Sequence, residues 1–150
     1  MFYLYGCSQR VPIYINEIMA KISKAARIEA GNLMEEAAEV FDSCVQCGMC
    51  KARCGVFRVL REEQYSPRGH GDLLSAKVQD KIIFECNMCR ACSVSCPLNI
   101  WVCDGVLKCR QAMVLMGKGL KGNEEMVANI RKTGSPFGKG KIDRDKLYCC

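Results

Sequence analysis

Apolar residues recur at helical spacing between Tyr14 and Phe41. They are Ile15, Ile18, Ile22, Ala25, Ala26, Leu33, Ala37, Val40 and Phe41. Charged residues occupy the other face, and Ala, Met and Glu, which favour helices, are abundant. This pattern predicts an amphipathic helix over 14–41, with an interruption at Gly31-Asn32.

A second helix is predicted to begin at Ser66-Pro67. Serine is a favoured N-cap, and proline fits the first turn of a helix. We expect this helix to continue through Leu73 and Leu74 to Val78, although glycines near its start weaken it.

A third helix is predicted from Trp101 to Met116. Its inward-facing side chains should be Val102, Val106, Leu107, Met113 and Val114. The stretch GKGLKG ends it, and a shorter helix should follow, with Asn123 as its N-cap and Gly134 at its end. No useful length of the chain alternates apolar and polar residues, so we predict an all-α fold.

Two runs of cysteines interrupt this helical pattern. CVQCGMCKARCG begins at Cys44 and CNMCRACSVSCP begins at Cys86, and both have the spacing C-x₂-C-x₂-C-x₃-C. The bacterial two-cluster ferredoxins have this spacing. Because each run is flanked by predicted helices, we expect an alpha-helical ferredoxin with two cysteine-rich loops in a pseudo-twofold arrangement.

Thiolates are soft ligands that select zinc, cuprous copper or iron–sulfur clusters. Zinc ribbons use separated C-x₂-C pairs, whereas here three cysteines fall within seven residues, so a single turning loop can place three thiolates on three corners of a cubane. In two-cluster ferredoxins the fourth cysteine of each run ligates the other cluster. The predicted ligands are Cys44, Cys47, Cys50 and Cys96 for one [4Fe–4S] cluster, and Cys86, Cys89, Cys92 and Cys54 for a second. Gly48 should allow the first loop to turn tightly.

Composition narrows the possible classes of protein. The chain has 150 residues and 13 cysteines, an odd number gathered in tight groups, which does not suit a secreted disulfide scaffold. We see no signal peptide, and no stretch approaches the ~20 apolar residues of a membrane span, so we predict a cytoplasmic protein. The formal charge of +6 would fall to about +2 if eight thiolates held two cores of about +2 each, so basicity alone does not indicate nucleic acid.

The motifs CVQCGMCKARC, SPRGH, CNMCRACSVSCP and GSPFG together resemble the helical dicluster ferredoxin domain of respiratory iron–sulfur subunits. These belong to glycolate and lactate oxidases, anaerobic glycerol-3-phosphate dehydrogenase and heterodisulfide reductase. The similarity covers roughly 41–144. We divide the chain into an N-terminal helical segment (1–42), a dicluster ferredoxin core (43–118), and a C-terminal helix with an extended tail (119–150).

The resemblance implies an electron-transfer subunit rather than a catalytic one. It would relay single electrons between a flavin-containing or cysteine-rich redox subunit and a second acceptor, quinone- or thiol-linked through a partner. Such a partner could hold the protein at the inner face of the membrane. Two alternatives are a catalytic disulfide-reductase-type subunit that uses Cys149 and Cys150, and a zinc-binding structural or nucleic-acid-binding protein.

The other cysteines, the histidine and several further residues are expected to have structural or surface roles. Cys103 and Cys109 are expected to pack as small apolar residues, with a third metal site as the alternative. Cys149 and Cys150 are expected to lie in a mobile tail, with a ligand role shared with a partner as the alternative, and Cys7 has no predicted role. His70, the single histidine, is expected to be a surface or capping residue, with tuning of a nearby cluster as the alternative. Arg68 could make charge-assisted bonds near a cluster or to the chain, or it could be a solvated residue at the helix start. Three side chains are expected to shield the clusters from water, namely Met49, Met88 and Leu98. Four lysines suggest a solvated basic surface: Lys118, Lys121, Lys139 and Lys141.

Overall fold

The computed structural model describes residues 22–138, and every regular element in that range is helical. The elements are α2 (Lys24–Glu39), α3 (Met49–Ala52), α4 (Gly55–Leu60), η1 (Glu63–Tyr65), α5 (Pro67–Ser75), η2 (Lys81–Glu85), α6 (Ala91–Val94), α7 (Val102–Leu115) and α8 (Lys121–Thr133). No strand occurs among these residues, so the predicted all-α fold is confirmed. The pseudo-twofold relation stays a prediction.

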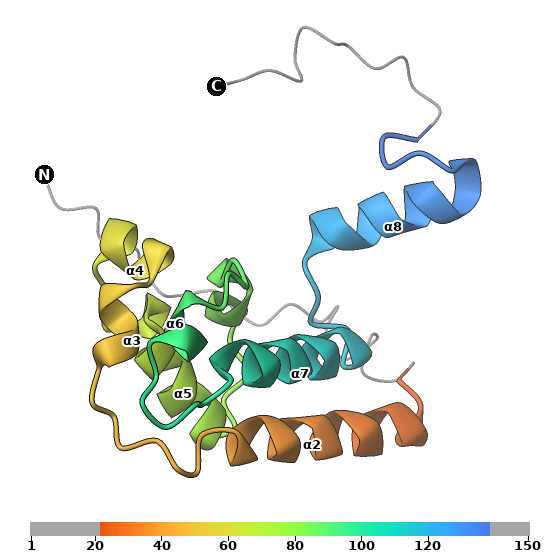
Figure 1. Cartoon of the computed structure of the whole chain (residues 1–150). Coiled ribbons are helices and arrows are strands. Elements are labelled where there is room, and N and C mark those ends of the chain that lie inside the picture. The colour runs from red at the N-terminus through yellow and green to blue at the C-terminus, as the bar shows by residue number, and fades with distance from the viewer. Residues whose placement is uncertain (1–21, 139–150) are drawn as a thin grey trace, which may run out of the picture. The chain divides into compact units, whose positions relative to one another are not determined.

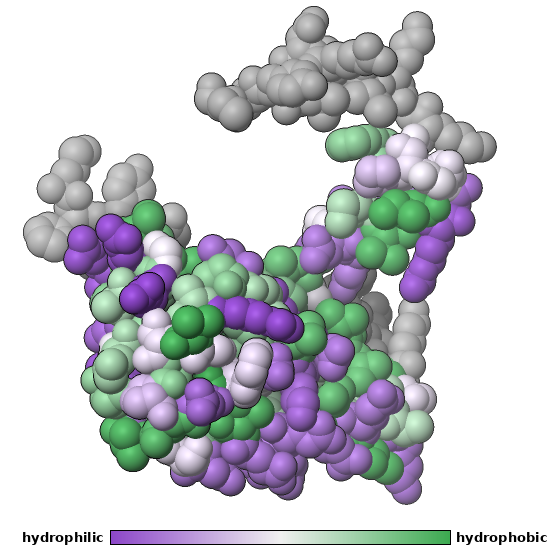
Figure 2. All heavy atoms as spheres, viewed as in Figure 1, coloured by the Kyte–Doolittle hydropathy of each residue, from purple (hydrophilic) through white to green (hydrophobic). Residues whose placement is uncertain are grey.

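The chain divides into two compact units after Gly117. In the first unit, α2 and α7 lie side by side, and the short helices that carry the cysteines gather next to them (Figure 1). Ala30 and Ala37 of α2 are buried, as are Val106 and Cys109 of α7. These side chains are small, so the two helices can approach closely. Polar side chains cover the outer edge of this unit along α2 (Figure 2).

The ring of Phe41 lies between α5 and α7, immediately before the first cysteine run. A Cβ atom added to Gly71 would lie 2.7 Å from this ring, and one added to Gly105 would lie 2.8 Å from it. Both glycines therefore permit a close approach that no larger residue allows. Their contacts fix Phe41, and hence the start of the first cysteine loop, against the helical core.

The predicted start of the second helix is confirmed. Ser66 is the N-cap of α5, and its Oγ accepts a hydrogen bond from the Gly69 N–H at 2.9 Å, with Pro67 in the first turn. The predicted end was wrong, because α5 stops at Ser75 and Val78 lies beyond it. Lys77 adopts a left-handed conformation there, with φ +55°, which turns the chain out of the helix.

Other predicted details need correction. Helix α2 runs through Gly31-Asn32 without interruption, and residues 14–21 of the predicted helix lie outside the described residues. On α7, Val102, Val106 and Met113 are buried as predicted, but two expected core residues, Leu107 and Val114, are exposed. Only one face of α7 packs against the core, and these two residues fall on its other side.

The second unit, described here through residue 138, consists of α8 and the turn that follows it. Helix α8 begins after Leu120, so Asn123 is not its N-cap as predicted, whereas Gly134 ends the helix in a left-handed conformation as expected. Figure 2 shows apolar side chains gathered on α8, where Met126, Val127 and Ile130 are exposed. None of the helices described is both long and apolar enough to span a bilayer.

Candidate metal centre

The two cysteine loops repeat the same backbone conformation. The residue two places after the first cysteine is left-handed in each run, with φ +53° at Gln46 and φ +57° at Met88. The residue after the second cysteine is left-handed as well, with φ +77° at Gly48 and φ +62° at Arg90. A four-residue helix follows at once in both runs, α3 or α6. The repeated spacing therefore corresponds to a repeated turn that brings the thiols of a run to one side.

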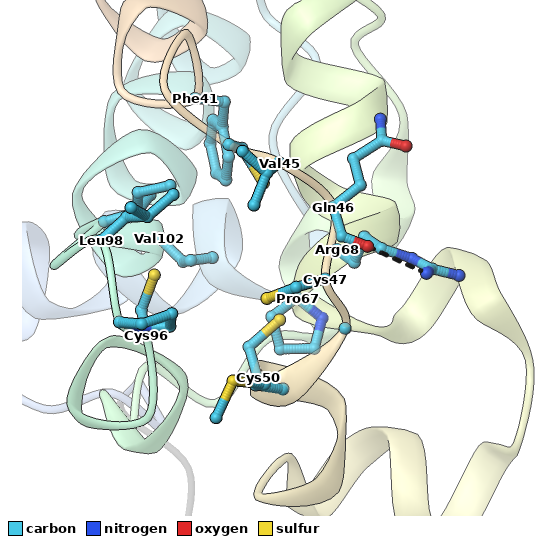
Figure 3. Close-up of a pocket in the computed structure, with 15 residues that line it drawn as sticks. Phe41, Val45, Gln46, Cys47, Cys50, Pro67, Arg68, Cys96, Leu98 and Val102 are labelled. Atoms are coloured by element: carbon cyan, nitrogen blue, oxygen red, sulfur yellow. Dashed lines mark hydrogen bonds between the residues drawn. The ribbon is translucent and has the colours of Figure 1, made fainter.

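The first hollow holds four thiols, from Cys44, Cys47, Cys50 and Cys96. Figure 3 shows the sulfur atoms of Cys47, Cys50 and Cys96 turned toward a shared space. Including its open side, the hollow contains about 430 Å³. Its remaining walls are largely apolar and include Phe41, Val45, Met49, Leu98 and Ile100.

The second hollow likewise collects three cysteines of one run and one cysteine of the other. Cys86, Cys89 and Cys92 line it together with Cys54 from the first run, and it contains about 350 Å³ including its open side. Its other walls are more polar and include Tyr65, His70, Asn87, Arg90 and Cys103. In both hollows the fourth cysteine of a run thus lies with the first three cysteines of the other run.

Three of the thiols have raised pKa values, so they form thiolates readily only when a positively charged group binds them in place of their protons. Burial raises the pKa of Cys50 and of Cys86, and burial together with the neighbouring Cys103 raises the pKa of Cys92 to about 12. A soft metal centre would take these positions as thiolates and release protons on binding. The ten described cysteines form no disulfide. No three His, Cys, Asp or Glu side chains within 22–138 converge on a point that suits a single ion.

Two arginines hold the loops by their backbone carbonyls. Arg110 of α7 donates to the Ile83 carbonyl at 2.9 and 3.1 Å and also to the carbonyl of Cys86, the first cysteine of the second run. Arg68 of α5 donates to the Gln46 carbonyl of the first run at 3.3 Å (Figure 3). Arg68 thus makes the bonds to the chain that its sequence position suggested. Sequence reasoning missed Arg110, although Val102, Val106 and Arg110 follow one another at four-residue spacing on the buried face.

Arg68 also belongs to an ion-pair group beside the first hollow. Its Nε donates to Glu63 at 2.8 Å, the Ser66 hydroxyl donates to the same carboxylate at 2.9 Å, and Lys51 pairs with its second oxygen. Burial alone would raise the pKa of Glu63, but these three donors outweigh it and hold the pKa at about 2. Two guanidinium nitrogens of Arg68, Nε and Nη1, are therefore bonded to the protein itself.

Helices α5 and α7 both begin at the partition between the hollows. Pro67, the first residue of α5, and Val102, the first residue of α7, each line both hollows. The N-terminus of a helix carries a partial positive charge that favours nearby anions. This placement suits a site whose thiolate ligands give it a negative charge.

Comparison with known proteins agrees with this donor set. Residues 40–100 match a protein family described as 4Fe-4S dicluster domain. This segment is an iron–sulfur, ferredoxin-like domain. Both cysteine runs lie within this segment, so the match supports [4Fe–4S] binding by residues 40–100.

Two curated relatives extend the comparison beyond the dicluster domain. The glycolate oxidase iron-sulfur subunit of Escherichia coli (strain K12) is 31% identical over 74 residues, covering 43% of this chain and 18% of that protein. A probable membrane-anchored ferredoxin of Chromohalobacter salexigens is 26% identical over 135 residues, covering 65% of this chain and 20% of that protein. The chain therefore spans about a fifth of the length of these relatives. No solved structure matches significantly.

The structure changes the interpretation of the other candidates. The surface role predicted for His70 is wrong, because its side chain is only 2% exposed. Cys103 and Cys109 are buried as expected, but Cys103 also lines the second hollow. Met49 and Leu98 line the first hollow, whereas Met88 packs against the core. Lys118 and Lys121 are exposed. The expectations for five other residues lie outside the described range: Cys7, Lys139, Lys141, Cys149 and Cys150.

Proposed function

We infer that this chain is an electron-transfer subunit that carries two [4Fe–4S] clusters and relays single electrons between a redox partner and a second acceptor. The proposed ligands are Cys44, Cys47, Cys50 and Cys96 for the first cluster, and Cys86, Cys89, Cys92 and Cys54 for the second. The observation that carries the proposal is the gathering of four thiols in each hollow, with one thiol exchanged between the runs.

The surroundings of the hollows support electron transfer without substrate chemistry. When bound, such clusters accept and release single electrons at potentials of roughly −700 to +450 mV. The apolar walls of the first hollow limit the access of water to its thiols. Cys47 and Cys89 are the exposed cysteines of the two runs, so each hollow presents its second cysteine to a partner. Pro67 and Val102 form the shared wall through which the two sites would communicate.

The proposed partner is a flavin-containing or cysteine-rich redox subunit. One relative is named as the iron–sulfur subunit of an oxidase, which supports a role inside a complex. The other is named a membrane-anchored ferredoxin, which supports attachment to a membrane through a partner. Isolation of the complex from its native host, followed by identification of the co-purifying chain, tests this part of the proposal. Recovery of the chain alone under mild conditions would contradict it.

The cluster content is tested by anaerobic purification and metal analysis. Two [4Fe–4S] clusters require about eight iron atoms and eight labile sulfides per chain, with a broad absorption near 400 nm. Cys50→Ala should lose about half of the iron, whereas Cys109→Ala, which changes a buried thiol outside both hollows, should keep all of it. Zinc in place of iron and sulfide would overturn the proposal.

Paired substitutions test the exchange of the fourth cysteines. Cys44 and Cys96 belong to one proposed cluster, so Cys44→Ala/Cys96→Ala should lose no more iron than either single variant. Cys86 and Cys96 belong to different clusters, so Cys86→Ala/Cys96→Ala should lose nearly all of it. The reverse result would show that each run keeps its own four cysteines. Iron and sulfide analysis of freshly reconstituted protein distinguishes the two arrangements.

A further inference from the structure

The second hollow contains a buried polar atom that the protein does not satisfy. The Nε2 atom of His70 has no hydrogen-bond partner among the described residues, its side chain is 2% exposed, and the residue lines the hollow of Cys86, Cys89 and Cys92. Leaving such a group unpaired costs about 1–3 kcal/mol. The hollow that His70 lines is an open space from which a bound group could reach Nε2.

The chemistry of the hollow determines what Nε2 can do. Thiolates and inorganic sulfides carry lone pairs but no proton, so they can only accept hydrogen bonds. Burial, and then the nearby positive charge of Arg110, lower the pKa of His70 to about 4, which favours the neutral ring. A neutral imidazole has one N–H, which Nε2 must carry to bond with an acceptor.

The start of α5 holds His70 in this position. The backbone N–H of His70 donates to the Ser66 carbonyl at 2.9 Å. On either side, a Cβ atom at Gly69 would lie 2.1 Å from the Glu63 carbonyl oxygen, and one at Gly71 would lie 2.7 Å from the Phe41 ring. The helix is thus seated closely against its neighbours at both flanking residues, and the imidazole is oriented before any group enters the hollow.

The first hollow has no buried side-chain donor that lacks a partner. Apart from its cysteines, its polar lining residues are Gln46 and Arg68. The Gln46 amide donates to Asp72 at 2.7 Å, and Arg68 donates to Glu63 and to the Gln46 carbonyl. These groups are bonded to the protein itself, so the two hollows differ in what they offer to a bound cluster.

We propose that His70 donates an Nε2–H hydrogen bond to the cluster in the second hollow and makes the midpoint potential of that cluster more positive. The proposal rests on the proposed function, since it requires a cluster at that position. Reduction adds a negative charge to the cluster, and a hydrogen-bond donor stabilises the reduced form more than the oxidised one. His70 is therefore a positioning and tuning residue for this site.

Potentiometric titration of the loaded protein tests the effect of the hydrogen bond. His70→Leu, which has no donor, should shift one of the two midpoint potentials to a more negative value and leave the other in place. His70→Gln keeps an N–H donor and should recover part of the shift. Leu74→Ala, one turn further along the same helix and outside both hollows, should lower the melting temperature without moving either potential. Unchanged potentials in His70→Leu would overturn the proposal.

A second measurement uses the unmodified protein. The chain contains a single histidine, so growth with ¹⁵N-histidine labels only His70. Pulsed electron paramagnetic resonance of the reduced protein should detect a ¹⁵N coupling to one cluster, and its absence in a fully loaded sample would overturn the proposal. Iron and sulfide analysis of the same sample separates the two hypotheses, because a sample without clusters contradicts the proposed function itself.

Discussion

The two cysteine hollows have the same loop conformation but different surroundings. Both runs turn through left-handed residues at matching positions, and both hollows collect three thiols from one run and one from the other. The first hollow is enclosed by apolar side chains and by polar groups bonded to the protein, whereas the second contains an unpaired imidazole and a fifth cysteine. A duplicated ligand pattern can therefore present two different environments, because residues outside the pattern supply the walls.

The largest effect that distinguishes the hollows is expected at the arginines. Arg110→Leu removes a half-buried guanidinium that holds the carbonyls of Ile83 and Cys86. Loss of charged hydrogen bonds with the carbonyls left unpaired should cost about 3 kcal/mol of unfolding free energy, and the second cluster should be lost preferentially. Denaturant unfolding and iron analysis measure the two effects.

Arg68→Leu is the matched change at the first loop. It removes the bond to the Gln46 carbonyl and the partly exposed pairing with Glu63, so its cost should be about 1 kcal/mol. Any loss of iron should concern the first cluster. Equal costs for the two arginine variants, or loss of the same cluster in both, would contradict this distinction.

A smaller effect is expected where α7 packs on Phe41, a residue that lines only the first hollow. In Gly105→Ala the new Cβ would lie 2.8 Å from the Phe41 ring and 3.2 Å from the Ala37 carbonyl oxygen. Overpacking of this kind should destabilise the protein by about 2 kcal/mol and weaken the first cluster more than the second. Thermal unfolding and the rate of cluster loss on exposure to air provide the measurements.

Gly31→Ala is the control for this change. Gly31 lies within α2 with nothing within 4 Å of an added Cβ, so the substitution should stabilise the protein by about 0.5–1 kcal/mol. If Gly31→Ala destabilised the protein as much as Gly105→Ala, the packing explanation would not hold.

A further small difference is expected between the left-handed residues that follow the second cysteine of each run. Gly48→Ala places a side chain at φ +77° and should cost about 1 kcal/mol. Arg90→Gly relieves a similar strain at φ +62° but loses the contact of the guanidinium with the Trp101 ring at 5.9 Å. The two terms of about 1 kcal/mol nearly cancel, so its stability should change little. Chemical denaturation measures both variants. If Gly48→Ala left the stability unchanged and Arg90→Gly lowered it, the loops would not share one conformation.

Local patterns in the sequence predicted several features correctly. The Ser66-Pro67 helix start, the left-handed turn at Gly48 and the helix end at Gly134 are confirmed. Each depends on the conformational preference of one residue or on a hydrogen bond between near neighbours, which a short stretch of sequence contains. The Asn123 cap failed because α8 begins earlier, and an N-cap preference alone does not determine where a helix starts.

The predictions that failed concern burial. The sequence places His70 between two glycines in a polar stretch, and that context favours the surface. The structure buries it because those glycines let α5 pack closely on Glu63 and Phe41. Leu107 and Val114 were assigned to the core from hydrophobicity, yet the face of α7 that meets α2 does not include them.

The sequence by itself determined the metal chemistry, since thiol spacing specifies which ligands a short loop can bring together and which metal centres accept them. It also determined the helical class, through apolar periodicity. Only the tertiary structure decided which groups surround each set of thiols. Arg110 and His70 come from helices well separated in sequence from Cys86, and contacts of that kind depend on how the helices pack rather than on any local pattern.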